Sequence, residues 1–131
     1  MARRLWPLHR GRPQVEVTLP LAASQAVQRR LLADTGAGSR RSGFELILDE
    51  RDCVSAGGIP LQPVILGGAY TGSFPVYLIR IELPDLGFDR HVSAVGAGTV
   101  PAGFDGIACY RFLNRFGYGN FGDRGQFGLE A

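Results

Sequence analysis

Apolar and polar residues alternate along much of this chain in the way that β-strands require. Residues 15–19 (VEVTL) alternate with a period of two, which predicts a half-buried strand. The apolar run at 76–83 predicts the clearest strand, and residues 91–95 are expected to pair near it. Residues 118–121 and 126–129 predict a closing hairpin. With 19 glycines to form tight turns, the chain is expected to be all-β.

The remaining segments are less regular. A second apolar run at 44–48 is followed by a charged stretch at 49–52, which is expected to be a surface connection. Residues 108–115 predict a short helix. Residues 22–32 are compatible with another short helix by composition alone.

Composition limits the function classes. The chain has 131 residues, 45% of them hydrophobic, which suits one globular domain with a core. No apolar run approaches the roughly 18 residues of a membrane span, and residues 1–12 lack the apolar core of a secretory signal. We therefore expect no membrane association and no export, which leaves the location as the cytoplasm or undetermined.

The positive charges gather near the N-terminus. All 14 basic residues are arginine, and the formal net charge is +2. Four of the arginines lie close to Trp6: Arg3, Arg4, Arg10 and Arg12. Such a cluster suggests contact with nucleic acid, but the simpler interpretation is a solvated, partly disordered basic arm at 1–13 that precedes a domain at 14–131. We expect the arm and no nucleic-acid partner. Two further pairs are expected at the surface: Arg29–Arg30 and Arg40–Arg41.

Cysteine and histidine give no sign of a metal site or a nucleophile. Cys53 and Cys109 have no export context, so free thiols are expected. His9 and His91 are isolated in the sequence and are expected at the surface or in packing contacts. We expect no metal and no cofactor.

The strongest chemical signal lies at residues 31–39 (LLADTGAGS), where an apolar run leads directly into Asp34 and a turn of small residues. Gly36 and Gly38 permit positive φ and close backbone approach, and Thr35 can anchor the turn through its hydroxyl. A strand that ends in this way presents a fixed carboxylate. The alternative role of Asp34 is an ordinary Asx turn that closes a strand.

Three segments together resemble the retropepsin-like aspartic proteases, the single-domain relatives of pepsin, over residues 14–129. Residues 32–37 (LADTGA) are similar to the active-site turn of that family. Residues 64–70 (VILGGAY) and the strand at 74–83 resemble the flap hairpin and the strand after it. Residues 103–113 (GFDGIACYRFL) resemble the segment that leads into the family's short C-terminal helix.

The resemblance implies a closed, barrel-like acid-protease fold with one short C-terminal helix, equivalent to one lobe of the pepsin architecture. It makes the latter half of 22–32, from Arg29 onward, a strand that enters the active-site turn. Where the family usually has a glycine, this chain has Cys109, and a side chain there could crowd the turn beneath the site. Gly57–Gly58 offers a competing position for the flap turn.

Aspartic proteolysis needs two carboxyl groups that share a proton, one to activate a water and the other to polarise the scissile carbonyl. Because the chain has a single Asp-Thr-Gly, the resemblance implies a homodimer in which both copies of Asp34 meet on a two-fold axis. Chain termini of the family interleave across that axis, so residues 118–129 are expected in the interface. The implied substrate is an extended peptide or protein.

The resemblance also implies roles for individual residues. Asp34 is the catalytic residue, Thr35 hydrogen-bonds across the two-fold, Gly36 leaves room for water and substrate, and Ala37 lines the cleft. The flap that covers the peptide comprises Leu66, Gly67, Gly68, Ala69 and Tyr70. The alternative function is a non-catalytic dimerisation or peptide-binding module on the same fold.

Overall fold

The computed structural model describes residues 2–131, with 50% strand and 10% helix. The strands are β1 (Arg3–Pro7), β2 (Gln14–Leu19), β3 (Val27–Ala33), β4 (Leu46–Asp49), β5 (Ile59–Leu66), β6 (Gly72–Leu83), β7 (Phe88–Ala97), β8 (Gly106–Ala108), β9 (Gly117–Gly119) and β10 (Gln126–Glu130). The helical elements are α1 (Glu50–Ser55), α2 (Tyr110–Leu113) and the 3-10 turn η1 (Pro84–Leu86). The all-β prediction is confirmed.

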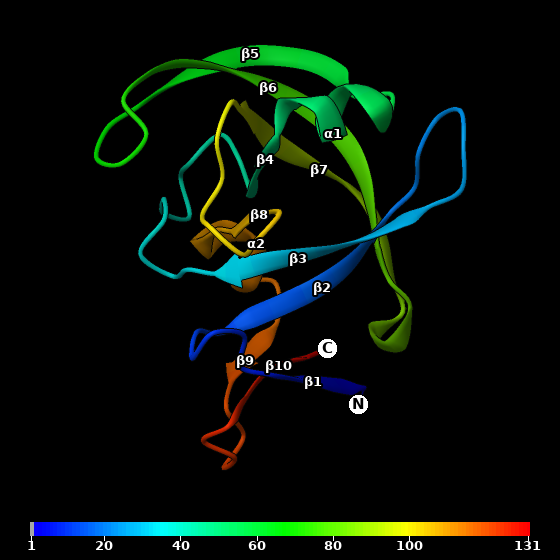
Figure 1. The fold of residues 1–131 in the computed structure, drawn as a ribbon, viewed down its shortest axis with the longest axis vertical. Coiled ribbons are helices and arrows are strands. Elements are labelled where there is room, and N and C mark those ends of the chain that lie inside the picture. The colour runs from blue at the N-terminus through cyan, green and yellow to red at the C-terminus, as the bar shows by residue number, and fades with distance from the viewer. Residues whose placement is uncertain (1) are drawn as a thin grey trace.

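Six strands form a closed barrel in the order β2-β3-β8-β4-β7-β6, and β6 returns to β2 through the pair Thr18 and Glu82 (Figure 1). Two of the neighbouring pairs are parallel, β3 with β8 and β4 with β7, and the others are antiparallel. Closure leaves the barrel strands with partners on both sides. The parallel pairing of β3 with β8 matters for the site described below, because it brings the ends of both strands to the same edge of the barrel.

The interior of the barrel holds the main core. Val15, Val17 and Leu19 of β2 are at most 1% exposed, so the period of two seen in the sequence corresponds to an inward face. Phe112 of α2 is also fully buried in this cluster. A second cluster joins the barrel to the β5–β6 hairpin, and it contains Phe44, Ile47, Val76, Val95, Ala97, Ile107 and Cys109, with Val64, Leu66, Tyr70 and Phe74 packed against them.

The β5–β6 hairpin extends beyond the barrel and turns at residues 67–71. Figure 1 shows this turn, in green, on the same side of the molecule as the cyan loop that follows β3. The Gly57–Gly58 pair instead links α1 to β5 and is separate from the hairpin turn. Residues 67–71 are therefore the tip of the projecting hairpin. We call the end of this hairpin, residues 64–74, the flap.

The chain termini form a second, three-stranded sheet in the order β1-β10-β9. The N-terminal segment differs from the expected solvated arm, because β1 pairs with β10 along its whole length and Trp6 is only 3% exposed. Arg3 forms an ion pair with Glu130 at 2.7 Å. The predicted closing hairpin is present as β9 and β10. Since β10 lies between two strands of its own chain, β1 and β9 are the outer strands of this sheet.

Two expectations about the helices need correction, those for residues 49–52 and 108–115. The charged residues at 49–52 begin α1, because the Asp49 carboxylate accepts a hydrogen bond from the Arg51 backbone N–H at 2.8 Å and caps the helix. The predicted helix at 108–115 shortens to α2, because the preceding residues are used by β8 between β3 and β4. The second half of 22–32 is strand, as the resemblance implied. The fold thus has two α-helices and a 3-10 turn, where one helix was expected.

Candidate active site

Asp34 follows directly after β3 and is anchored by the neighbouring parallel strand. Its backbone N–H donates to the carbonyl of Ala108, the last residue of β8, at 3.0 Å. Leu31, two residues before Ala33 on β3, is fully buried, so the strand itself is held by the core. The apolar lead-in seen in the sequence therefore fixes the backbone from which the carboxylate projects.

The turn after Asp34 is closed by hydrogen bonds on both sides. The Gly36 N–H donates to Asp34 Oδ1 at 2.9 Å, and the Ala37 N–H donates to the Asp34 carbonyl at 3.1 Å. The Tyr110 N–H of α2 donates to the Ala37 carbonyl at 2.9 Å. A Cβ atom at Gly36 would lie 3.2 Å from Asp34 Oδ1, closer than ordinary contact, so the turn favours glycine there. The Asx-turn hydrogen bond of the alternative role for Asp34 is thus present, and it engages Oδ1.

A cavity of about 290 Å³ lies between this turn and the flap. Its roof is formed by Leu66, Gly67, Gly68, Ala69 and Tyr70, and its other walls by Asp34, Gly36, Ala37, Gly38, Phe44, Ile47 and Ile107. Asp34 is the only carboxylate among these lining residues. The structure therefore brings together the predicted flap and the predicted Asp34, Gly36 and Ala37 around one mostly apolar hollow. Thr35 is exposed beside it.

The flap turn has the backbone that a glycine-rich tip requires. Gly68 adopts a φ of +69°, and no atom lies within 4 Å of the position that a Cβ would take. The Thr71 hydroxyl donates to the Gly68 carbonyl at 3.0 Å, which closes the turn. The rings of Tyr70 and Phe74 meet edge to face with their centroids 6.2 Å apart. These contacts direct the tip over the cavity.

Cys109 occupies the position where a glycine was expected, and it does not distort the backbone. Its φ of −84° is ordinary for any residue, and its thiol is fully buried in the cluster beneath the flap. Burial, and secondarily the nearby charge of Asp34, raises the pKa of the Cys109 thiol to about 12. The side chain therefore packs into the core without forcing the backbone into a strained conformation. Cys53 and Cys109 are both free thiols, as predicted.

A partly buried ion pair ties the segment after α2 to the segment before β4, and sequence patterns did not reveal it. Glu45 is 2% exposed, and its Oε1 accepts hydrogen bonds from Arg115 Nε at 2.9 Å and Nη2 at 2.6 Å. Arg111 Nη1 donates to the Ser42 carbonyl at 2.9 Å. Together with the contact between Tyr110 and Ala37, these bonds hold the loop after Asp34 against α2. The only signal in the sequence was a lone glutamate in an apolar segment.

Other residues considered in the sequence lie outside the cavity. Arg29 forms a two-pronged ion pair with Asp52, at 2.7 and 2.9 Å. Asp105 accepts a hydrogen bond from the Arg30 backbone N–H at 2.8 Å, so it joins β3 to the segment before β8. His9 packs edge to face on Phe104, with ring centroids 5.3 Å apart. Within residues 2–131, no cluster of three or more potential ligands suits a metal ion.

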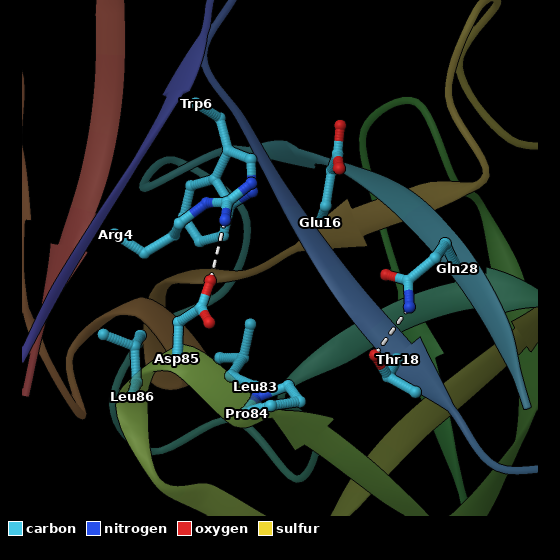
Figure 2. Close-up of a pocket in the computed structure, with 9 residues that line it drawn as sticks. All are labelled: Arg4, Trp6, Glu16, Thr18, Gln28, Leu83, Pro84, Asp85 and Leu86. Atoms are coloured by element: carbon cyan, nitrogen blue, oxygen red, sulfur yellow. Dashed lines mark hydrogen bonds and ion pairs between the residues drawn. The ribbon is translucent and has the colours of Figure 1, made fainter.

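A second hollow of about 190 Å³ lies between the terminal sheet, β2, β3 and η1 (Figure 2). Arg4 and Asp85 both line it and form an ion pair at 2.7 Å, and the Arg4 guanidinium lies 5.5 Å from the Trp6 ring centroid. Figure 2 also shows the Gln28 amide bonded to the Thr18 hydroxyl. None of the predicted site residues lines this hollow, and its charged groups are already paired, Arg4 with Asp85 and Glu16 with Arg30 outside the hollow.

No family model, curated protein or solved structure matches the chain. Over residues 2–131, the structure also contains no helix with the length and apolar character needed to cross a membrane.

Proposed function

We propose that the protein is an aspartic endopeptidase of the retropepsin-like kind, in which two copies of Asp34 form the catalytic pair. The observation that carries the proposal is the position of Asp34, held at the end of β3 on one wall of an apolar cavity beneath a glycine-turned hairpin. A carboxylate placed in this way can act on a backbone bound under the flap.

The chemistry requires a second carboxyl group, and among residues 2–131 Asp34 is the only one that lines the cavity. An isologous dimer supplies it, because a two-fold axis brings a surface patch against its own copy. Thr35 and Gly36 are exposed next to Asp34, so a partner has access to this face. In the dimer, one carboxylate takes a proton from the attacking water while its protonated partner donates to the scissile carbonyl oxygen.

The terminal sheet changes how that dimer is expected to form. β10 has β1 on one side and β9 on the other, so a partner strand has no free edge of β10 to pair with. A shared sheet would have to form through β1 or β9. We therefore place the main dimer contact at the Asp34 loops, with the terminal sheet contributing through its outer strands.

The proposed substrate is an extended peptide that lies between the flap and the Asp34 turn. The cavity walls of Phe44, Ile47, Leu66 and Ile107 favour apolar side chains next to the scissile bond. Backbone groups of the peptide would bond to the flap as an added strand. Neither a metal nor a cofactor has a part in this mechanism.

Replacement of Asp34 by asparagine tests the proposal. Asparagine keeps an oxygen that accepts from the Gly36 N–H, so the turn is expected to survive, while cleavage of a denatured protein substrate at acidic pH falls by at least about a hundredfold. Asp123→Asn is the matched control, because Asp123 Oδ1 accepts from the Gly125 N–H at 2.9 Å in the same local geometry, far from the cavity.

Three outcomes decide between the candidate functions. Loss of cleavage in Asp34→Asn alone supports the protease. Equal activity in both variants refutes it. A wild-type chain that binds extended peptides without cleaving them, even as a dimer, favours the non-catalytic peptide-binding module.

A further inference from the structure

The tip of the flap is hydrogen-bonded to the loop that follows β7. The Tyr70 hydroxyl donates to the backbone carbonyl of Thr99 at 3.2 Å. Thr99 lies in the loop between β7 and β8, a separate part of the chain from the flap and from the Asp34 turn. The bond therefore joins the tip of the projecting hairpin to the loop between two barrel strands.

We propose that Tyr70 is a positioning residue that latches the flap over the Asp34 cavity, so that the bond from its hydroxyl to the Thr99 carbonyl sets how often the flap opens. The consequence for peptide turnover rests on the proposed protease function, whereas the latch itself does not.

Three features of the tip make Tyr70 suited to this role. Its ring lines the cavity and packs edge to face on Phe74 at the base of the turn, which fixes the direction of the hydroxyl. Burial raises the pKa of Tyr70 above its ordinary value, so the hydroxyl keeps its proton and remains a donor. The base of the flap packs against the buried cluster, but its tip has few other contacts, since Ile65 is 86% exposed and no atom lies within 4 Å of a Cβ built on Gly67 or Gly68. A single hydrogen bond can therefore shift the opening equilibrium.

Hydrogen exchange of the flap amides tests the latch without any need for catalysis. Tyr70→Phe keeps the ring contact with Phe74 and removes only the hydroxyl. Because one neutral hydrogen bond changes an equilibrium by roughly threefold to tenfold, protection of the amides at 64–74 should fall by about that factor, while the barrel amides of β2 and β7 stay unchanged. Tyr70→Ala, which also loses the ring packing, should lower protection further.

Thr99→Ala is the matched control for exchange, because the acceptor is a backbone carbonyl that the substitution retains. Its flap amides should exchange at the wild-type rate. Tyr118→Phe controls for loss of a tyrosine hydroxyl elsewhere, since Tyr118 lies in the terminal sheet. Equal flap protection in wild type and Tyr70→Phe overturns the latch, and so does a fall in protection that extends through the whole barrel.

Peptide cleavage gives a second, separate result. If the latched flap holds substrate equally in the ground state and the transition state, Tyr70→Phe raises KM by roughly threefold to tenfold and leaves kcat within about twofold. A fall in kcat with KM unchanged contradicts the latch. If the wild-type chain cleaves nothing, the proposed protease function fails, and the exchange measurement still decides whether Tyr70 holds the flap.

Discussion

The ion pair between Glu45 and Arg115 offers a sharp test of how the site is supported. Glu45 is 2% exposed, and both of its hydrogen bonds from Arg115 go to Oε1, while Oε2 is buried without a hydrogen-bond partner. We consider Arg115→Met, which keeps an unbranched apolar chain next to Phe88, whose ring centroid lies 5.8 Å from the guanidinium. The change leaves a carboxylate in the interior with only Arg111 Nε near it, at 4.0 Å.

The expected loss of stability follows from the burial of the orphaned charge. Breaking a buried ion pair by removal of one partner destabilises a protein by about 3–5 kcal/mol. Because Arg115 is 35% exposed and water can reach its position, we expect the low end, about 3 kcal/mol. With a urea m-value of about 1.5 kcal/mol/M, the unfolding midpoint should fall by about 2 M.

A double variant separates the charge effect from lost packing. Glu45→Met combined with Arg115→Met removes both charges, and a buried pair replaced by apolar groups is often neutral or stabilising. The double variant should therefore recover to within about 1 kcal/mol of wild type. Urea unfolding followed by the fluorescence of Trp6, at two protein concentrations to separate any effect of dimerisation, measures all of the variants. An Arg115→Met loss below about 1 kcal/mol, or a double variant as unstable as the single one, would refute the reasoning.

Two other predictions concern the flap and the buried thiols. Gly68→Val places a β-branched residue at a φ of +69°, which should distort the flap turn, raise the exchange rate of the flap amides and lower peptide turnover. Gly67→Val is the control, because Gly67 has open space around it and no positive φ, and it should change little. Equal behaviour of the two variants would contradict this prediction. Burial raises the pKa of Cys53 and of Cys109 from 9.0 to about 12, so the unfolded chain loses these protons first and stability should fall as pH rises above 9. The free energy of unfolding should fall by at most about 1.4 kcal/mol per pH unit for each thiol. In urea titrations between pH 8 and 10, Cys109→Ala should halve this slope, and a flat profile would exclude the effect.

Local patterns in the sequence were sufficient to predict many of the strands. The alternation at 15–19 predicted β2 because side chains of a strand point to opposite faces, and the inward residues Val15, Val17 and Leu19 are all buried. The long apolar run predicted most of β6, and the glycine-rich turn between two short strands predicted the hairpin of β9 and β10. The small residues after Asp34 likewise predicted a tight turn, which needs only contacts between neighbours such as Gly36 and Asp34.

The tertiary structure decided what depends on residues far apart in the chain. Nothing local shows that β3 lies parallel to β8, yet that pairing anchors Asp34 through the Ala108 carbonyl. The pairing of β1 with β10 converted an expected loose arm into an ordered strand, because Trp6 finds its burial only against distant segments. The short helix α1 was missed for a related reason, since its stability comes from a cap and from burial of Cys53 rather than from a helical pattern.

The contacts that hold the site in place also join residues that are far apart in the chain. Glu45 and Arg115 are separated by 70 residues, and Tyr70 and Thr99 by 29, so both contacts exist only once the barrel has closed. Sequence by itself determined which segment would turn sharply at a carboxylate, because that depends on residue types within a few positions. Only the folded barrel decided what surrounds that carboxylate, because a cavity is made from side chains that meet across the chain.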